Sequence, residues 1–201
     1  MALLFAKNNS LSAVTSLPAS ISGGGLNLIS TQTASSSATI DFTSGIDSTY
    51  KEYIFKFYNI HPATDNSNFS FQVDTGTNTN YNITTTNTLF HAFHFEAGGG
   101  ESLTYDSNRD LAQSTSFTVL IDSLGTDNDQ NASGTVHIFD PSSDTYVKHF
   151  IGSANTNTQN DGSINCFSAG YFNTTTALTR VRFKMSSGSI ESGVIKMYGV
   201  T

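Results

Sequence analysis

The densest group of potential metal ligands or acid–base residues in this sequence is His91, His94 and Glu96. They lie in 88–96, where apolar and polar residues alternate as in a half-buried β-strand. Because side chains alternate across a strand, positions 91 and 94 point to opposite faces. His94 and Glu96 share a face, but two ligands are fewer than the three or four that zinc sites use. We therefore expect packing or surface histidines and no metal.

The run 127–131, Asp-Asn-Asp-Gln-Asn, begins like a calcium-binding loop, with oxygen-bearing side chains at alternate positions. The pattern then breaks, because the sixth position is Ala132 instead of glycine. The twelfth position is Ile138 instead of a bidentate glutamate. A plain solvated loop is the favoured interpretation, and an irregular calcium site remains open.

No pattern of nucleophilic catalysis is complete in the sequence. Serine, histidine and aspartate are all present, but no Gly-x-Ser-x-Gly elbow accompanies them. The glycine runs 23–25 and 98–100 match neither a dinucleotide fingerprint nor a P-loop. The single cysteine, Cys166, lies within an apparent strand, where a buried structural thiol is expected. We assign no catalytic residues and no cofactor, and we expect a protein that is not an enzyme.

Sugar binding is a separate possibility, because aromatic rings stack on sugars while asparagine and aspartate bind their hydroxyls. Tyr58, Tyr105 and Tyr171 are the candidate stacking residues. The polar segments 75–80, 123–133 and 153–162 are candidate binding loops. The alternative is that these tyrosines only line a sheet with their hydroxyls in water.

The composition indicates what kind of chain must position these residues. The 201 residues fit one domain, and the net charge of −7 argues against a nucleic-acid partner, which would need a basic face. One cysteine allows no disulfide within the chain. The apolar start, Met1–Ala6, is too short for a secretory signal, and no stretch is long enough for a membrane span.

The periodicity predicts an all-β fold, organised around the segment 50–73. Tyr53, Phe55 and Phe57 alternate on one arm of a turn, and Phe69 and Phe71 alternate on the other. This pattern predicts a hairpin with a buried aromatic face. Further candidate strands are 26–33, 38–42, 81–85, 88–96, 102–105, 116–121, 134–139, 145–151, 163–172, 178–185 and 194–200. Ten to twelve short antiparallel strands predict a two-sheet, jelly-roll-like sandwich over residues 26–201.

Residues 1–25 are expected to form an extended N-terminal arm. Leu3, Leu4 and Phe5 begin it, Pro18 interrupts any helix, and three glycines precede the first strand. Two interpretations remain. The arm either packs back on its own domain or docks on a neighbouring subunit, which would cover an otherwise exposed Leu-Leu-Phe. We favour docking because of the glycine joint at 23–25.

Four segments carry a resemblance to a known family: ISTQTASSSATIDFTSGID (29–47), YKEYIFKFYNIHPATD (50–65), 128–149 with its FDPSS and VKHF, and FKMSSGSIESGVIKMYGV (183–200). Together the chain resembles the β-sandwich virion surface proteins of marine tailed bacteriophages, which include capsid decoration, collar and tail-fibre components. The resemblance covers most of the chain and includes no catalytic motif.

The resemblance implies a structural protein of the virion, assembled in the host cytoplasm and bound to other virion proteins through its arm. A homo-oligomer, with a trimer as the first hypothesis, is expected by analogy alone. A long fibre shaft would show heptads, which the sequence lacks. A small peripheral module such as a capsid decoration protein or a head or tail knob is therefore favoured. The alternative is a tail-fibre tip that binds a receptor or a host surface glycan.

Overall fold

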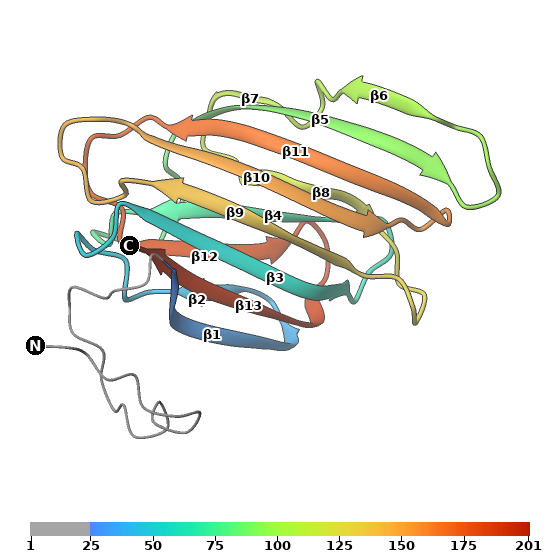
Figure 1. Cartoon of the computed structure of the whole chain (residues 1–201), viewed down its shortest axis with the longest axis horizontal. Helices are drawn as coiled ribbons and strands as arrows, with labels where there is room; N and C mark the ends of the chain where they lie inside the picture. Colours follow the sequence, from blue (N-terminus) through green and yellow to red (C-terminus); the bar gives the residue numbers. More distant parts are fainter. Residues whose placement is uncertain (1–24) are drawn as a thin grey trace, which may run out of the picture.

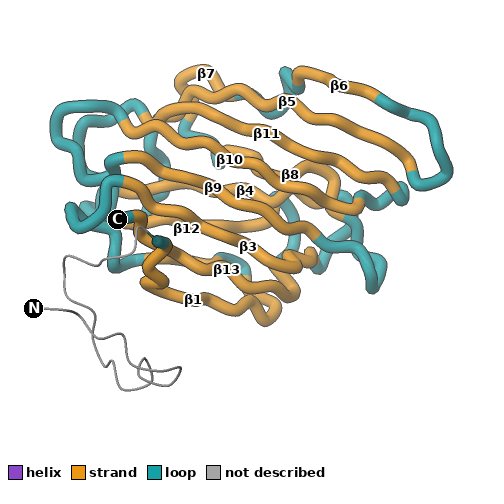
Figure 2. The backbone as a smooth tube through the Cα atoms, viewed as in Figure 1, coloured by secondary structure: helices purple, strands orange, loops and turns teal. Residues whose placement is uncertain are grey.

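The computed structural model describes residues 25–201, which fold into two antiparallel β-sheets packed face to face (Figure 1). The prediction of an all-β, two-sheet antiparallel sandwich is confirmed. Residues 25–201 contain no helix, and the loops gather at the two ends of the strands (Figure 2). Apart from Gly25, the expected docking arm of residues 1–25 lies outside the described residues.

The larger sheet contains nine strands and the smaller sheet four. The larger sheet runs in the order β1 (Leu26–Ser37), β13 (Ile190–Val200), β3 (Glu52–Pro62), β9 (Ala132–Phe139), β10 (Lys148–Asn157), β11 (Gly162–Phe172), β5 (Thr85–Phe95) and β6 (Ser102–Tyr105), and β7 (Leu111–Ser114) also pairs with β5. The smaller sheet runs in the order β2 (Ile40–Phe42), β12 (Arg180–Met185), β4 (Ser67–Asp74) and β8 (Thr118–Leu124).

An aromatic cluster fills the space between the two sheets. Phe183 of β12 lies at its centre, with ring centroids 5.5 Å from Phe55, 5.6 Å from Phe69, 6.1 Å from Phe71 and 6.2 Å from Phe42. All five rings are buried. Burial of this much apolar surface is the main force that holds the two sheets together.

The expected hairpin across 50–73 is wrong, although its buried aromatic residues are correct. Phe55 and Phe57 are 0% and 1% exposed, as the alternation predicts. However, β3 pairs with β13 and β9 in the larger sheet, whereas β4 pairs with β12 and β8 in the smaller one. The turn at 63–66 therefore carries the chain from one sheet to the other. The two aromatic rows face each other across the core, and Phe57 and Phe69 lie 5.2 Å apart.

Several other strand boundaries differ from the prediction. The serine run 35–37 belongs to β1, because its backbone pairs with β13 as far as Ser37 and Ile190. Residues 81–84 form no strand, and β7 was not expected. The expected polar loop 153–162 is mostly strand, since β10 continues to Asn157 and the turn comprises only 158–161. The expected strands 134–139 and 145–151 correspond to β9 and β10, which pair with each other as an antiparallel hairpin.

The smaller sheet covers only one face of the larger sheet, and not all of it (Figure 1). Leu89 of β5 is fully buried, but the later residues of β5 are only partly buried and all of β6 is exposed. The face of the larger sheet that points away from the smaller sheet is here called the outer face. It carries the side chains that alternate with the inward-facing ones along each strand. Phe90, Leu103, Tyr105 and Ile151 are exposed on it.

Candidate functional site

The structure separates the two histidines that the sequence places close together. His91 lies opposite Cys166 of β11 and shares its inward side, whereas His94 lies opposite Ser163 on the outer face. Nε2 of His94 is 3.3 Å from Oε1 of Glu101, and Glu96 accepts a 3.3 Å hydrogen bond from Asn157. Among residues 25–201, no three His, Cys, Asp or Glu side chains lie close enough together to hold a metal ion.

The calcium-like run 127–131 forms a loop between β8 and β9 that is fixed by one of its own side chains. Gln130 is buried, and its amide donates to the carbonyl of Thr158 and to Asp161 at 3.0 and 3.1 Å. An open cavity of about 410 Å³ is lined by residues 128–131 of the loop together with His61 and Glu191. Nδ1 of His61 is 2.7 Å from the Gln130 carbonyl oxygen, which ties this cavity wall to the loop.

Cys166 is a buried thiol in the middle of β11, as expected. Burial raises the pKa of this thiol to about 11. Its thiolate, the reactive form, is therefore scarce at neutral pH. This environment is that of a structural cysteine.

We predict that Cys166 does not react with a thiol reagent in the folded protein. At pH 8 a thiol with a pKa of about 11 is only roughly one part in a thousand thiolate, and the side chain is 1% exposed. Labelling by iodoacetamide, followed by mass spectrometry, should be negligible in buffer and complete in denaturant. Fast labelling of the folded chain would contradict this assignment.

The three candidate stacking tyrosines all lie on the outer face but far apart along it. Tyr58 is on β3 beside Lys196, and Tyr171 is on β11 beside His149. Tyr105 is on β6 directly opposite Phe90 of β5, and its hydroxyl donates to Asp110 at 2.7 Å. Of the three, only Tyr105 has an exposed phenylalanine as its cross-strand partner.

Three rings from neighbouring strands form a group that we call the aromatic platform: Phe90, Phe167 and Tyr105. Phe90 and Phe167 are cross-strand partners whose rings stack at 5.0 Å and 15°. Phe90 is 42% exposed and Tyr105 is 53% exposed. The sequence places each ring in a strand, but only the pairing of β11, β5 and β6 shows that they are neighbours. No local sequence signal gives that pairing.

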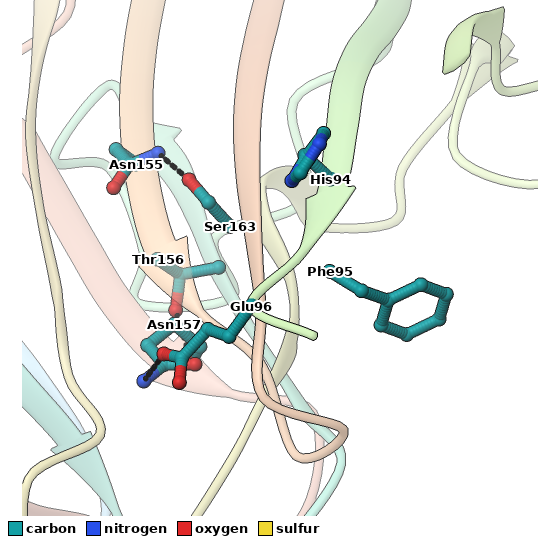
Figure 3. Close-up of a pocket in the computed structure, with 7 residues that line it drawn as sticks. All are labelled: His94, Phe95, Glu96, Asn155, Thr156, Asn157 and Ser163. Carbon is teal, nitrogen blue, oxygen red and sulfur yellow. Dashed lines mark hydrogen bonds between the residues drawn. The ribbon is translucent and has the colours of Figure 1, made fainter. Parts of the chain in front are cut away.

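A polar pocket lies farther along the same strands, toward the C-terminal end of β5 (Figure 3). We call it the strand-end pocket; it has a volume of about 190 Å³. It is lined by His94, Phe95, Glu96, Asn155, Thr156, Asn157 and Ser163. The ring of Phe95 points away from the other labelled side chains in Figure 3, all of which carry polar groups.

Hydrogen bonds hold the walls of the strand-end pocket in place. The Asn155 amide donates to Oγ of Ser163 at 2.9 Å and to the Ile164 carbonyl at 3.0 Å. The Asn157 amide donates to the Glu96 carboxylate, and its Oδ1 is buried and accepts no hydrogen bond from residues 25–201. These bonds use the donors of Asn155 and leave its Oδ1 and the Ser163 hydroxyl proton for other partners.

On the outer face of the smaller sheet, by contrast, charged and aromatic side chains bind one another. Arg182 makes a bidentate ion pair with Asp41 at 2.8 and 2.6 Å and lies 4.0 Å from the centre of the Tyr81 ring. Hydrogen bonding to Asp41 raises the pKa of Arg182, and burial raises the pKa of Tyr81. Tyr81 is 2% exposed, so its ring is part of the packing of this surface and is not available to stack on a ligand.

The fold and the site define an all-β sandwich with one partly open sheet face. That face carries an aromatic platform and a polar pocket. A scan against protein-family models and searches of curated proteins and of solved structures found no match. None of residues 25–201 forms a helix that could cross a membrane.

Proposed function

We propose that this chain is a non-enzymatic structural protein of a bacteriophage virion. It forms a peripheral surface module, such as a capsid decoration protein or a head or tail knob, and residues 1–25 anchor it to other virion proteins. The observation that carries this proposal is the place where the described fold begins. Among residues 25–201 the first strand is β1, which starts at Leu26 and forms an edge of the larger sheet.

An arm that leaves from an edge strand can bind elsewhere without disturbing the sandwich. Within residues 25–201, β1 pairs only with β13, so its other edge has backbone groups that no described strand pairs with. Such an edge is a ready template for another chain. The sequence resemblance to virion surface proteins supports the same role, with assembly in the host cytoplasm and a homo-oligomer on the particle, for which a trimer is the first hypothesis.

We predict that removal of residues 1–25 leaves a folded domain that no longer joins the particle. Circular dichroism and a thermal melt should match those of the full chain, because the deletion leaves every strand of residues 26–201 in place. Purified particles that lack the protein should take up the full chain and not the truncated one, as measured by quantitative mass spectrometry. Normal uptake of the truncated domain would show that the anchor lies elsewhere.

A tail-fibre tip that binds a receptor or a glycan is the alternative function. The specific observation in its favour is the aromatic platform on the same sheet face as the strand-end pocket. Large exposed rings next to hydrogen-bonding groups are typical of a ligand site and not of an inert surface. The two functions are compatible, since a surface module can also bind the host.

A further inference from the structure

We propose that the outer face of β10, β11 and β5 binds a neutral oligosaccharide, with the aromatic platform as one subsite and the strand-end pocket as the next. This inference rests on the glycan-binding alternative above and names its site and ligand class. The site lies on the strands of the larger sheet. Of the binding loops expected from the sequence, only 153–162 contributes, through Asn155 and Asn157 of β10.

The two subsites lie on the same sheet face and follow one another along β5. Positions 90, 92, 94 and 96 of β5 alternate onto the outer face, so Phe90 and His94 are separated by four residues of one strand. At about 3.3 Å per residue, this separation is about 13 Å. Ala92 and Asn165, a cross-strand pair, lie between the subsites, and Leu103 of β6 lies opposite Ala92. A ligand that uses both subsites must therefore be an extended chain of more than one ring.

The aromatic platform suits the apolar face of a sugar ring. The C–H groups on one face of a pyranose carry a small positive charge, and the face of an aromatic ring is negative. Stacking of Phe90 on Phe167 at 15° fixes the orientation of the platform before any ligand arrives. A preorganised aromatic surface lowers the entropy cost of binding.

The strand-end pocket suits the hydroxyl groups of one ring. Its volume of about 190 Å³ is below the ~300–1,000 Å³ of sites for drug-sized ligands, so a single ring is the appropriate occupant. The walls offer the Ser163 hydroxyl as a donor and Oδ1 of Asn155 as an acceptor. The unsatisfied Oδ1 of Asn157 is one more acceptor, and buried polar atoms are rarely left without a partner.

The charges around the pocket decide between neutral and acidic sugars. Glu96 lines the pocket, and Glu101 lies 3.3 Å from His94 at its edge. Each of these carboxylates would repel a uronic acid or a sulfated sugar. Amide and hydroxyl groups provide the other polar contacts, so we infer a neutral ligand.

The test measures binding of the full chain to short neutral oligosaccharides of glucose, galactose and mannose at millimolar concentration. Saturation-transfer NMR detects the contact, and titration calorimetry gives the dissociation constant. We expect at least one of them to bind, an oligouronate not to bind, and Phe90→Ala and Asn155→Ala each to weaken binding about tenfold. Tyr58→Ala is the matched control, because it removes an exposed ring from the same face on β3 and should leave binding unchanged.

Each other outcome overturns part of the proposal in a recognisable way. Sugar binding that survives Phe90→Ala and Asn155→Ala would keep the glycan-binding function and refute this site. No binding by any oligosaccharide would refute both the glycan-binding function and this site. Phe90→Ala could instead dissociate an oligomer of the parent chain, as measured by analytical ultracentrifugation. In that case the platform is an interface between copies of the chain, and the sugar site is wrong. None of these results changes the expected uptake of the chain by particles.

Discussion

Replacement of Phe183 by alanine should lower the free energy of unfolding by about 3–5 kcal/mol. The ring is 0% exposed and lies within 6.2 Å of four other phenylalanine rings from both sheets. Its removal leaves a cavity where the two sheets meet, and β12 cannot move to fill it because β2 and β4 flank it. Since whole domains are stable by only about 5–15 kcal/mol, the loss should be evident in chemical denaturation.

The control for this prediction is an exposed ring of the same class. Tyr146 is 71% exposed in the loop before β10, and Tyr146→Ala should change the unfolding free energy by less than about 0.5 kcal/mol. Both variants should keep the denaturant dependence of the parent, since the surface exposed on unfolding hardly changes. Equal effects of the two substitutions would mean that Phe183 is not the centre of the core.

Period-two alternation was sufficient to predict the fold class and much of the core. It identified Phe55, Phe57, Phe69 and Phe71 as buried because side chains on one face of a strand share one environment. It could not show which strands pair. A turn between two alternating segments gives the same local pattern whether the segments form a hairpin or face each other from two sheets, and β3 and β4 do the latter.

The candidate site could not be predicted from the sequence for the same reason. Phe90 and Phe167 are 77 positions apart, and their stacking follows from the register of β5 against β11. Asn155 and Asn157 belong to a segment whose composition is typical of a loop. The backbone of this segment nevertheless pairs with β9 on one side and with β11 on the other, and Asn155 takes part in both pairings. Partner strands distant in sequence thus override the local propensity of Asn and Thr for turns.

The outer face also explains why an apolar patch can persist on this sandwich. Polar groups surround its rings: Tyr105 donates to Asp110, and the Asn155–Ser163 bond lies farther along the same surface. An apolar patch with a polar rim is characteristic of a recognition surface, whereas an unprotected patch would promote aggregation. The proposed virion attachment and the proposed sugar site involve different parts of the chain, residues 1–25 and the outer face.

Lys148→Ala should destabilise the domain by about 3 kcal/mol, because this lysine joins the two sheets from inside the sandwich. Its side chain is 0% exposed, and Nζ donates to the carbonyls of Thr174 at 3.1 Å and Thr176 at 2.8 Å. Those carbonyls lie in the segment that crosses from β11 in the larger sheet to β12 in the smaller one. Without the lysine they lose their charged donor, and hydrogen exchange in 173–179 should increase.

The variant Lys148→Met keeps most of the buried stem and removes the charge, so it separates packing from hydrogen bonding. Lys148→Met should lower the free energy of unfolding by less than Lys148→Ala does, since no large cavity forms. Burial lowers the pKa of Lys148 below its ordinary value of 10.5, so the unfolded chain binds more protons between the two values. The stability of the parent relative to Lys148→Met should therefore rise with pH as pH approaches 10.5. The raised pKa values of Tyr53 and Tyr81 act equally on both proteins and cancel in this difference. A difference that is flat or falls over this range would show that the ammonium group is not desolvated in the folded protein.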